Sequence, residues 1–538
     1  MQEMSDNLRT IFGQKEESKS AIIYGHNPII GMDYPDADVI RVEDTYYMVS
    51  TTMYFMPGGV ILRSYDLIHW EIASYVYHTL DDTAAQNLLG EQNIYGKGMW
   101  AASIRYHKGT FYICFVANDT HKTYLYTSNQ IEGPWKKQYI EGFYHDCSLL
   151  FDDDDRVYII YGNRQIHLTE LREDLSGPLE GGINRIIVTD GSDTSLGYEG
   201  THFYKINGRY YAFFIHSLAD RWYRSQACYS SDSLLGEFVG QDVLVDDMGH
   251  RNAGIAQGGI VDTPDGKWYA ILFQDRGAVG RIPVLVPMEW RNQMPVLGIE
   301  GKAPISIESV STRPDYKYEP LYVSDDFNYE PNEEGMVTLH LAWQWNHNPQ
   351  MDLWSVVERK GALRLKSGKL CRNLLEAYNT LTQRTAEIVS CAEVTLDGSG
   401  MKKGDYAGIC VLLGCYAAIG LTYDEEGYSI VKFGKSVKDG ALHQMDRNTN
   451  LSSPEIHERI YVDSKEVKFK VCVDFHDGVD EATFYYEKEQ KWIPIGCPHK
   501  LYFRLDLFTG CRFGLYYYST LEMGGHVDFM KFRYNILE

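Results

Sequence analysis

The sequence of 538 residues has no apolar run as long as a membrane-spanning helix, and its first twenty residues lack the apolar core of a secretory signal. Ten cysteines are scattered along the chain without a CxxC pair or a Cys/His spacing typical of a metal site. We therefore expect a cytoplasmic protein with free thiols, in which residues 1–20 form an N-terminal tail.

Positive charge is also scarce, with 51 basic residues against 74 acidic ones and a formal net charge of −23. This excess repels phosphate and argues against nucleic acid or an anionic membrane as a partner. A glycine-rich phosphate-binding loop and a GxSxG nucleophile turn are missing too, so we expect neither a P-loop protein nor an α/β serine hydrolase. Self-association into a homo-oligomer is left open.

Tyrosine is abundant, and five of the 41 tyrosines stand in a repeated pattern. In each repeat a Gly or Asp turn precedes the tyrosine by three residues, and an apolar, strand-forming run follows. The repeats recur every 46 to 65 residues, about one four-stranded blade with its loops, and no helical periodicity interrupts them. Residues 21–303 are therefore predicted to form a five-bladed β-propeller. The segments are DTYYMVSTT (44–52), GTFYICFVA (109–117), DRVYIIYGN (155–163), GRYYAFFIH (208–216) and GKWYAILFQ (266–274).

Equivalent positions ahead of the repeated tyrosines carry polar or aromatic residues. Since the first strand of each blade lines the axis of a propeller, these positions should converge there. Three carboxyl groups at one end of a channel should repel one another. Such a cluster persists only where it binds a cation or performs acid–base chemistry. The residues are Asp36, eleven positions before its tyrosine, and Trp100, Asp146, Glu199 and Gln257, each twelve positions before theirs.

The stretch YPDADVI (34–40) holds two aspartates, and Asp beside Pro before a strand is typical of a turn. The blade register favours a functional role for Asp36. For Asp38, a place in a turn or on a strand face is the better interpretation.

The blade pattern stops near residue 303, and residues 304–320 are predicted to form a linker. From residue 321 to 538, apolar or alternating segments of five to eight residues, separated by Gly, Asp or Lys turns, predict an all-β sandwich. Asp326 and Asp528 are candidate calcium ligands in this domain. The alternative is that the sandwich only covers one face of the propeller and shapes the pocket entrance.

Several motifs resemble glycoside hydrolase family 43, the five-bladed β-xylosidases and α-L-arabinofuranosidases. The similar stretches are PDADVIRVEDTYYMVSTT, GMWAASIRYHKGTFYI, HDCSLLFDDDDRVYI and YEGTHFYKINGRYYAF. The C-terminal stretches LAWQWNHNPQMDLWSV and YNTLTQRT resemble the concanavalin-like β-sandwich appended to the β-xylosidase branch. The resemblance thus spans the propeller and the sandwich.

The resemblance implies roles for the three axial carboxyl groups. The family's general base falls on Asp36 and its general acid on Glu199. Its third carboxylate, which modulates the pKa of the acid and positions the sugar, falls on Asp146. In this sequence Gln257 stands where many members have a histidine near a bound calcium or water, so no cofactor is expected to be required, although a structural calcium ion is left open.

Further residues are expected to bind the sugar. Trp100 suits a stacking wall, with a core tryptophan as the alternative. The resemblance implies that Met53, His145 and Arg281 line the pocket, and His145 could equally be a structural hydrogen-bond partner. Phe508 resembles a residue of a sandwich loop that reaches over the pocket, with a core position as the alternative.

Together these features predict an exo-acting, inverting glycoside hydrolase that releases terminal β-D-xylose from xylo-oligosaccharides or arabinoxylan fragments. Inversion requires two carboxyl groups about 6.5–9.5 Å apart, a spacing that different blades can supply. One alternative is an enzyme that acts mainly on α-L-arabinofuranosides. A non-catalytic carbohydrate-binding protein is the other, but a binding protein has no use for an acid at the axis.

Overall fold

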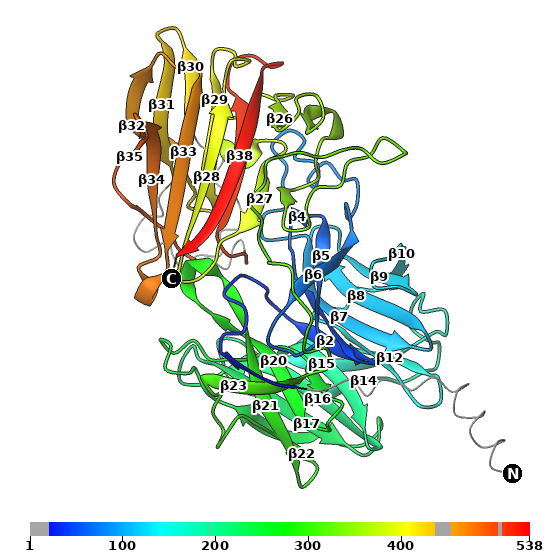
Figure 1. Ribbon diagram of the computed structural model, residues 1–538. Helices are drawn as coiled ribbons and strands as arrows, with labels where there is room; N and C mark the ends of the chain where they lie inside the picture. The colour runs from blue at the N-terminus through cyan, green and yellow to red at the C-terminus, as the bar shows by residue number, and fades with distance from the viewer. Residues whose placement is uncertain (1–20, 192, 436–452, 504–507, 538) are drawn as a thin grey trace, which may run out of the picture.

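The computed structural model describes residues 21–191, 193–435, 453–503 and 508–537, and the predicted tail of residues 1–20 lies outside these ranges. Within them, nearly all regular structure is β-strand, and the helices are four 3₁₀ turns of three residues each. None of the helices found in these ranges is long and apolar enough to cross a membrane. Figure 1 shows two domains in contact, the N-terminal one in blue to green and the C-terminal one in yellow to red.

The N-terminal domain is a five-bladed β-propeller, as predicted. Each blade is a four-stranded sheet with its strands in chain order, apart from a two-residue strand that the first blade leaves out. The blades are β2 (Asp38–Val42), β3 (Thr45–Ser50), β5 (Gly58–Ser64) and β6 (Glu71–Tyr77); β7 (Met99–His107), β8 (Thr110–Ala117), β9 (Lys122–Ser128) and β10 (Lys136–Ile140); β11 (Ser148–Phe151), β12 (Val157–Asn163), β13 (Gln165–Leu171) and β14 (Asn184–Thr189); β15 (Glu199–Ile206), β16 (Arg209–Ser217), β17 (Arg224–Ser231) and β18 (Val239–Leu244); and β19 (Ile260–Asp262), β20 (Trp268–Asp275), β21 (Arg281–Arg291) and β22 (Met294–Leu297).

The repeated tyrosines all lie in the second strand of a blade. Tyr47 is in β3, Tyr112 in β8 and Tyr158 in β12, and the last two are in β16 and β20. The Gly or Asp turn ahead of each tyrosine therefore joins the first strand to the second. A constant distance upstream of the tyrosine then reaches the start of each first strand, which is the part of the blade that faces the axis.

The C-terminal domain is the predicted β-sandwich. One sheet has the order β32-β31-β30-β29-β37-β27-β24-β4, and the other has the order β25-β26-β38-β28-β33-β34-β35, with β36 paired to β34. The strands are β4 (Phe55–Met56), β24 (Gln344–Asn346), β25 (Trp354–Ser355), β26 (Leu363–Lys366), β27 (Leu381–Arg384), β28 (Val389–Asp397), β29 (Asp405–Leu412), β30 (Ala417–Asp424), β31 (Gly427–Gly434), β32 (Glu455–Val462), β33 (Glu466–Asp474), β34 (Glu481–Lys488), β35 (Lys491–Pro494), β36 (His499–Lys500), β37 (Arg512–Ser519) and β38 (His526–Leu537).

The two domains share structure across their junction. Strand β4 belongs to the first blade in sequence but pairs with β24 and so extends a sandwich sheet. Within the predicted linker 304–320, β23 (Ser306–Ser311) pairs with β1 (Ala21–His26) near the start of the described chain. One continuous hydrophobic core joins blades one and five to the sandwich. The sandwich is therefore anchored to the propeller through both backbone pairing and apolar packing.

Two cysteines correct the prediction of free thiols. Cys391 in β28 and Cys472 in β33 are directly opposite in the strand register, and they form a disulfide with Cα atoms 4.1 Å apart. The sequence offered no sign of this pair, because the two residues are 81 positions apart and become neighbours only through strand pairing. The other eight cysteines are not joined in disulfides.

The two candidate calcium ligands in the sandwich already have cationic partners. Asp528 is buried and binds Arg359 at 2.8 Å and Arg364 at 2.8–2.9 Å. Asp326 binds Arg533 at 2.6 Å. Arginine thus supplies the positive charge that calcium ligation would otherwise provide at these positions.

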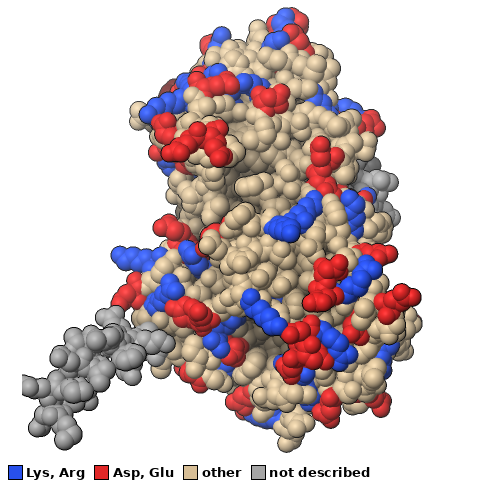
Figure 2. Space-filling view, turned by 90° about the vertical axis from the view of Figure 1, so that its right-hand side faces the viewer, with Lys and Arg blue, Asp and Glu red and all other residues tan. Residues whose placement is uncertain are grey.

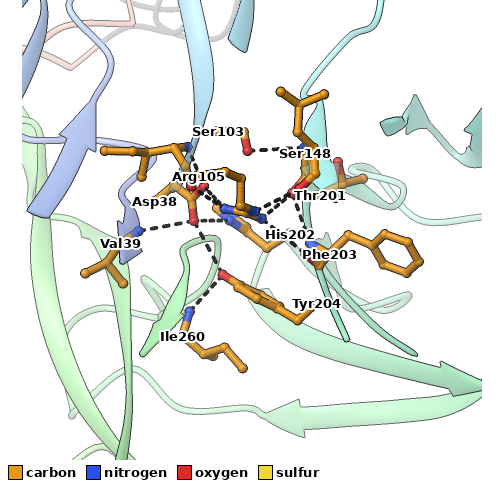
Figure 3. Close-up of polar contacts among 12 residues, drawn as sticks. Asp38, Val39, Ser103, Arg105, Ser148, Thr201, His202, Phe203, Tyr204 and Ile260 are labelled. Atoms are coloured by element: carbon orange, nitrogen blue, oxygen red, sulfur yellow. Dashed lines mark hydrogen bonds and ion pairs between the residues drawn. The ribbon is translucent and has the colours of Figure 1, made fainter. Parts of the chain in front are cut away.

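Asp38 joins several blades near the propeller axis, as Figure 3 shows. Arg105 and the backbone N–H of Ile104 donate to one of its oxygens at 2.6 and 2.8 Å, and His202 contacts the other at 3.1 Å. Arg105 also donates to Ser148 at 2.6 Å, so the network connects the first four blades. Burial opposes the charge, but Arg105 and His202 outweigh it and lower the pKa of Asp38 to about 2. Asp38 is a structural residue of a strand.

We expect Asp38→Asn to destabilise the protein by about 3–5 kcal/mol, because it leaves the buried Arg105 without its counter-charge. Since the folded-state pKa lies below the ordinary value of 3.8, this stabilisation is complete above about pH 4 and is lost as the pH falls toward 2. Denaturant midpoints at neutral and acidic pH measure it. The control is Asp155→Asn, which removes an exposed ion pair and should not move the midpoint. Equal midpoints for Asp38→Asn and the wild type at neutral pH would contradict the assignment.

Candidate active site

One cavity of about 430 Å³ opens at the propeller axis, and all five residues selected from the blade register line it. They are Asp36, Trp100, Asp146, Glu199 and Gln257, one from each blade. The carboxyl groups are sheltered, with side chains about 8% exposed for Asp36 and Asp146 and 21% exposed for Glu199. The structure therefore brings together groups that are up to 221 positions apart in sequence.

The backbone at these positions departs from regular strand geometry. Asp36, Asp146 and Gln257 have left-handed φ values of 54°, 49° and 57°. At Trp100 and Glu199 the first strand of the blade contains a register shift typical of a β-bulge. Such backbone is uncommon for residues other than glycine and concentrates at functional sites. Here it occurs at the entrance of every first strand, where the side chains line the cavity.

Asp36 is held by Arg281, the first residue of β21. The guanidinium donates to Asp36 Oδ1 at 3.0 Å, and both side chains are nearly buried. Asp33 fixes this corner, because its carboxylate accepts from the backbone N–H of Arg281 at 2.9 Å and from that of Gly510 at 2.8 Å. Gly510 belongs to the sandwich, so Asp33 also connects the cavity wall to the loop that carries Phe508.

Phe508 reaches the cavity from the sandwich. Its ring centre lies 5.8 Å from that of Trp100 and 5.3 Å from the Arg281 guanidinium carbon. Met53 lines the same region, so three apolar side chains form one wall. Close approach of the loop depends on Gly510, because a Cβ there would lie 2.0 Å from the Val279 carbonyl oxygen. Phe508, Trp100 and Met53 thus line the same wall of the cavity.

His145 lies between the other two carboxyl groups. Its Nε2 is 3.7 Å from Asp146 Oδ2 and 3.6 Å from Glu199 Oε2. The backbone N–H of Gly200 donates to Asp146 at 3.0 Å, and Asn163 donates to Glu199 through its side-chain amide. Each carboxyl group is therefore oriented by a donor from a neighbouring strand.

The electrostatics of this cluster follow from burial and from neighbouring charges. Burial raises the pKa of Asp146 to about 6; the carboxylates of Glu199 and Asp36 act in the same direction, and His145 opposes them. Burial lowers the pKa of His145, but the carboxylates of Asp146 and Glu199 outweigh it and raise that pKa to about 9. At neutral pH the imidazole is therefore cationic and Asp146 is anionic.

Several cavity residues escaped the sequence analysis. Arg224, the first residue of β17, is buried and pairs with Asp275, which also lies 3.7 Å from Arg281. Asn163 ends β12, and Trp222 lies in the β16–β17 connection. Each of these residues occurs in one blade without an equivalent in the others, so its distance from a repeated tyrosine did not indicate a place in the cavity.

The charged groups at the axis differ in how far protein donors already engage them. Both oxygens of Asp38 are occupied by Arg105, His202 and backbone N–H groups. Among the residues that the structure describes, the group compact enough for a metal is His145, Asp146 and Glu199, with ligand atoms within 4.8 Å of one another. This group offers two carboxyl groups and one imidazole, whereas calcium prefers about six to eight oxygen ligands.

Comparison with known protein families gives the class of the protein. The family described as glycosyl hydrolases family 43 matches residues 25–295, half of the chain. The family described as the β-xylosidase C-terminal concanavalin A-like domain matches residues 326–535. The chain therefore belongs to glycoside hydrolase family 43, and the match to the second domain confirms the predicted concanavalin-like sandwich.

Individual relatives cover most of the chain. A β-xylosidase of Formosa agariphila is 28% identical over 95% of this chain and 90% of its own length. A non-reducing end α-L-arabinofuranosidase of Bacteroides ovatus is 26% identical over 72% of this chain and 73% of its own length. A solved structure, a bifunctional GH43-CE protein of Bacteroides eggerthii, superposes with a TM-score of 0.87 at 39% identity, over 96% of this chain and 64% of its own.

Proposed function

We propose that the protein is an exo-acting, inverting glycosidase that releases terminal β-D-xylose from xylo-oligosaccharides. One observation carries the proposal: carboxyl groups from blades one, three and four, those of Asp36, Asp146 and Glu199, line a single sheltered cavity. Family membership and the β-xylosidase relative support the same chemistry. The reaction needs only water and the chain's own carboxyl groups.

Asp36 would act as the general base. Arg281 engages its Oδ1, which leaves Oδ2 as the oxygen that can accept a proton from the attacking water. The water adds to the anomeric carbon from the face opposite the leaving group, so the product has the inverted configuration. Asp36 and Glu199 come from blades one and four, which supports the wider separation that this mechanism requires.

Glu199 would donate the proton to the glycosidic oxygen as the bond to the anomeric carbon breaks. It is the most exposed of the three carboxyl groups, consistent with contact to an incoming substrate. Asn163 holds one carboxyl oxygen, so the other can face the leaving oxygen. Asp146 and His145 lie on its buried side and fix its electrostatic environment.

The apolar wall supports exo action and suits two sugars, β-D-xylose and α-L-arabinofuranose. Phe508, Trp100 and Met53 offer flat or flexible apolar surface to a sugar ring, and the sandwich loop closes the cavity beside them. α-L-Arabinofuranose presents its hydroxyl groups similarly to β-D-xylose. The relative from Bacteroides ovatus favours α-L-arabinofuranosidase activity as the second candidate.

Initial rates on 4-nitrophenyl β-D-xylopyranoside and 4-nitrophenyl α-L-arabinofuranoside test the function. A higher rate on the xyloside supports the main proposal, and the reverse order supports the second candidate. Proton NMR of the sugar released first from the xyloside should detect the α-anomer. A folded wild-type protein that hydrolyses neither substrate, or a β-anomer as first product, would contradict the proposal.

We expect Asp146→Asn to lower the upper pH limit of activity. Above about pH 6 Asp146 is anionic, and its charge, within 4.8 Å of Glu199, opposes loss of the proton that the acid must donate. Asparagine removes the charge at nearly constant shape, so the alkaline limb of the kcat–pH profile should move down by about one pH unit. An unchanged profile would remove this role, whereas a uniform fall in kcat at every pH would indicate a purely orienting one.

A further inference from the structure

The cavity extends beyond the carboxyl groups along blades three and four. Its lining there includes Ser195, Leu196, Trp222 and Arg224. The base and its arginine belong to blades one and five, and the apolar wall is formed by Met53 of blade one, Trp100 of blade two and Phe508 of the sandwich. Two chemically different sides thus face each other across the cavity.

The positions of acid and base decide which side receives which part of the substrate. In an inverting reaction the acid contacts the leaving oxygen, whereas the base holds water on the opposite face of the ring. Glu199 begins the first strand of blade four, and the β16–β17 connection that carries Trp222 belongs to the same blade. The departing group should therefore lie over blades three and four.

Trp222 has the features of a binding platform at that position. Its side chain is 46% exposed although it lines the cavity, which is unusual for so large an aromatic group. The guanidinium carbon of Arg224 lies 5.5 Å from the centre of the indole. Arg224 is itself only 6% exposed and ion-paired with Asp275, so it backs the ring with a fixed cation.

Leu196, in the β14–β15 connection, is hydrogen-bonded to the β16–β17 hairpin that carries Trp222. The backbone N–H of Leu196 donates to the Ser217 hydroxyl at 2.9 Å, and the backbone N–H of Ser217 donates to the Leu196 carbonyl at 2.9 Å. Leu218 and Tyr223 close the hairpin through a backbone hydrogen bond of 3.0 Å. Trp222 and Leu196 are therefore held as one unit beside Glu199.

We infer that Trp222, backed by Arg224, is the platform on which the leaving-group sugar stacks, so that the cavity holds a second sugar next to the one that is released. This inference rests on the proposed function and names the substrate as a disaccharide or longer oligosaccharide. An indole stacks on the C–H face of a sugar ring without fixing its hydroxyl pattern. The platform therefore accepts xylose units, and it does not contribute to binding of a lone terminal sugar.

Calorimetric titration in a Glu199→Gln background tests the platform without turnover. In the proposed arrangement, xylose fills the position of the released sugar, and xylobiose fills that position and the platform. Trp222→Ala should weaken xylobiose binding about tenfold and leave xylose binding unchanged, and Trp222→Phe should recover most of the loss. Leu235→Ala is the matched control, since Leu235 is 69% exposed on the same blade and does not line the cavity.

Each outcome decides the question separately from the activity assay. Equal weakening of xylose binding and xylobiose binding by Trp222→Ala, or no weakening of either, would contradict the platform role of Trp222. So would equal affinities for the two sugars before Trp222 is changed. If the proposed function is wrong, the wild-type protein does not hydrolyse xylosides. The ratio of xylobiose affinity to xylose affinity then still tests the role of Trp222. Unfolding midpoints equal to that of the parent exclude a folding defect.

Discussion

Replacing Glu199 by glutamine should lower kcat on xylobiose by about 10³-fold, while 4-nitrophenyl β-D-xylopyranoside loses far less. The sugar leaving group departs as a strongly basic alkoxide unless it receives a proton. The 4-nitrophenolate ion is stable without one. Glutamine keeps the size of Glu199 and an oxygen that can accept from Asn163, so the change removes the proton and little else. Comparing kcat for the two substrates, in variant and wild type, measures the contribution of the acid.

Two results would contradict this assignment. An equal loss on both substrates would mean that Glu199 serves binding or shape, because a structural defect does not discriminate between leaving groups. Retained turnover of xylobiose would move the acid role to another cavity residue, of which Asp146 is the nearest carboxyl group. Glu170→Gln serves as a matched control, since Glu170 is a buried glutamate of blade three that does not line the cavity.

The parts of the site that repeat could be predicted from the sequence. Asp36 and Glu199 were found because every blade begins in a similar way, so an offset of eleven or twelve residues from the repeated tyrosine reaches the axis each time. The same reasoning covers Trp100, Asp146 and Gln257, which share no local motif. Periodicity in the chain thus becomes convergence in space, without knowledge of any contact.

The unrepeated parts depend on contacts that no local pattern encodes. Trp222 and Arg224 lie in a single hairpin, and only the fold brings them to the cavity that Glu199 also lines. Strand β4 has only two residues and is a strand because it pairs with β24, which lies almost three hundred positions later in the sequence. The sequence placed Asp38 in a turn or on a strand face but gave no sign of its network, because its partners Arg105 and His202 come from other blades. Tertiary pairing decided each of these cases.

The His145 imidazole is the contact that most changes the electrostatics expected from the sequence. Three acidic groups at one axis suggested repulsion among carboxylates alone. The structure adds a cation 3.6–3.7 Å from two of them, and Arg281 supplies another beside Asp36. These charges allow the carboxyl groups to share a sheltered cavity, and they orient each group toward a different task.

Replacing Asp36 by asparagine should lower kcat by about 10³–10⁴-fold on every substrate, whatever its leaving group. Water must lose a proton to attack the anomeric carbon in each case, and asparagine cannot take that proton. Its amide has the size of the carboxylate, so the cavity and the position of Arg281 should persist. A loss that is equal on xylobiose and on 4-nitrophenyl β-D-xylopyranoside therefore distinguishes the base from the acid.

Azide provides the decisive complement, because it is already an anion and needs no base. With Asp36→Asn and 4-nitrophenyl β-D-xylopyranoside, azide should attack the anomeric carbon, release 4-nitrophenolate and form α-xylosyl azide, restoring much of the lost rate. No rescue is expected for Glu199→Gln with xylobiose, where the missing step is protonation of the leaving oxygen. A β-configured azide would contradict the proposed roles, since it would mean that the sugar first becomes attached to the enzyme and that the reaction proceeds through two inversions instead of one.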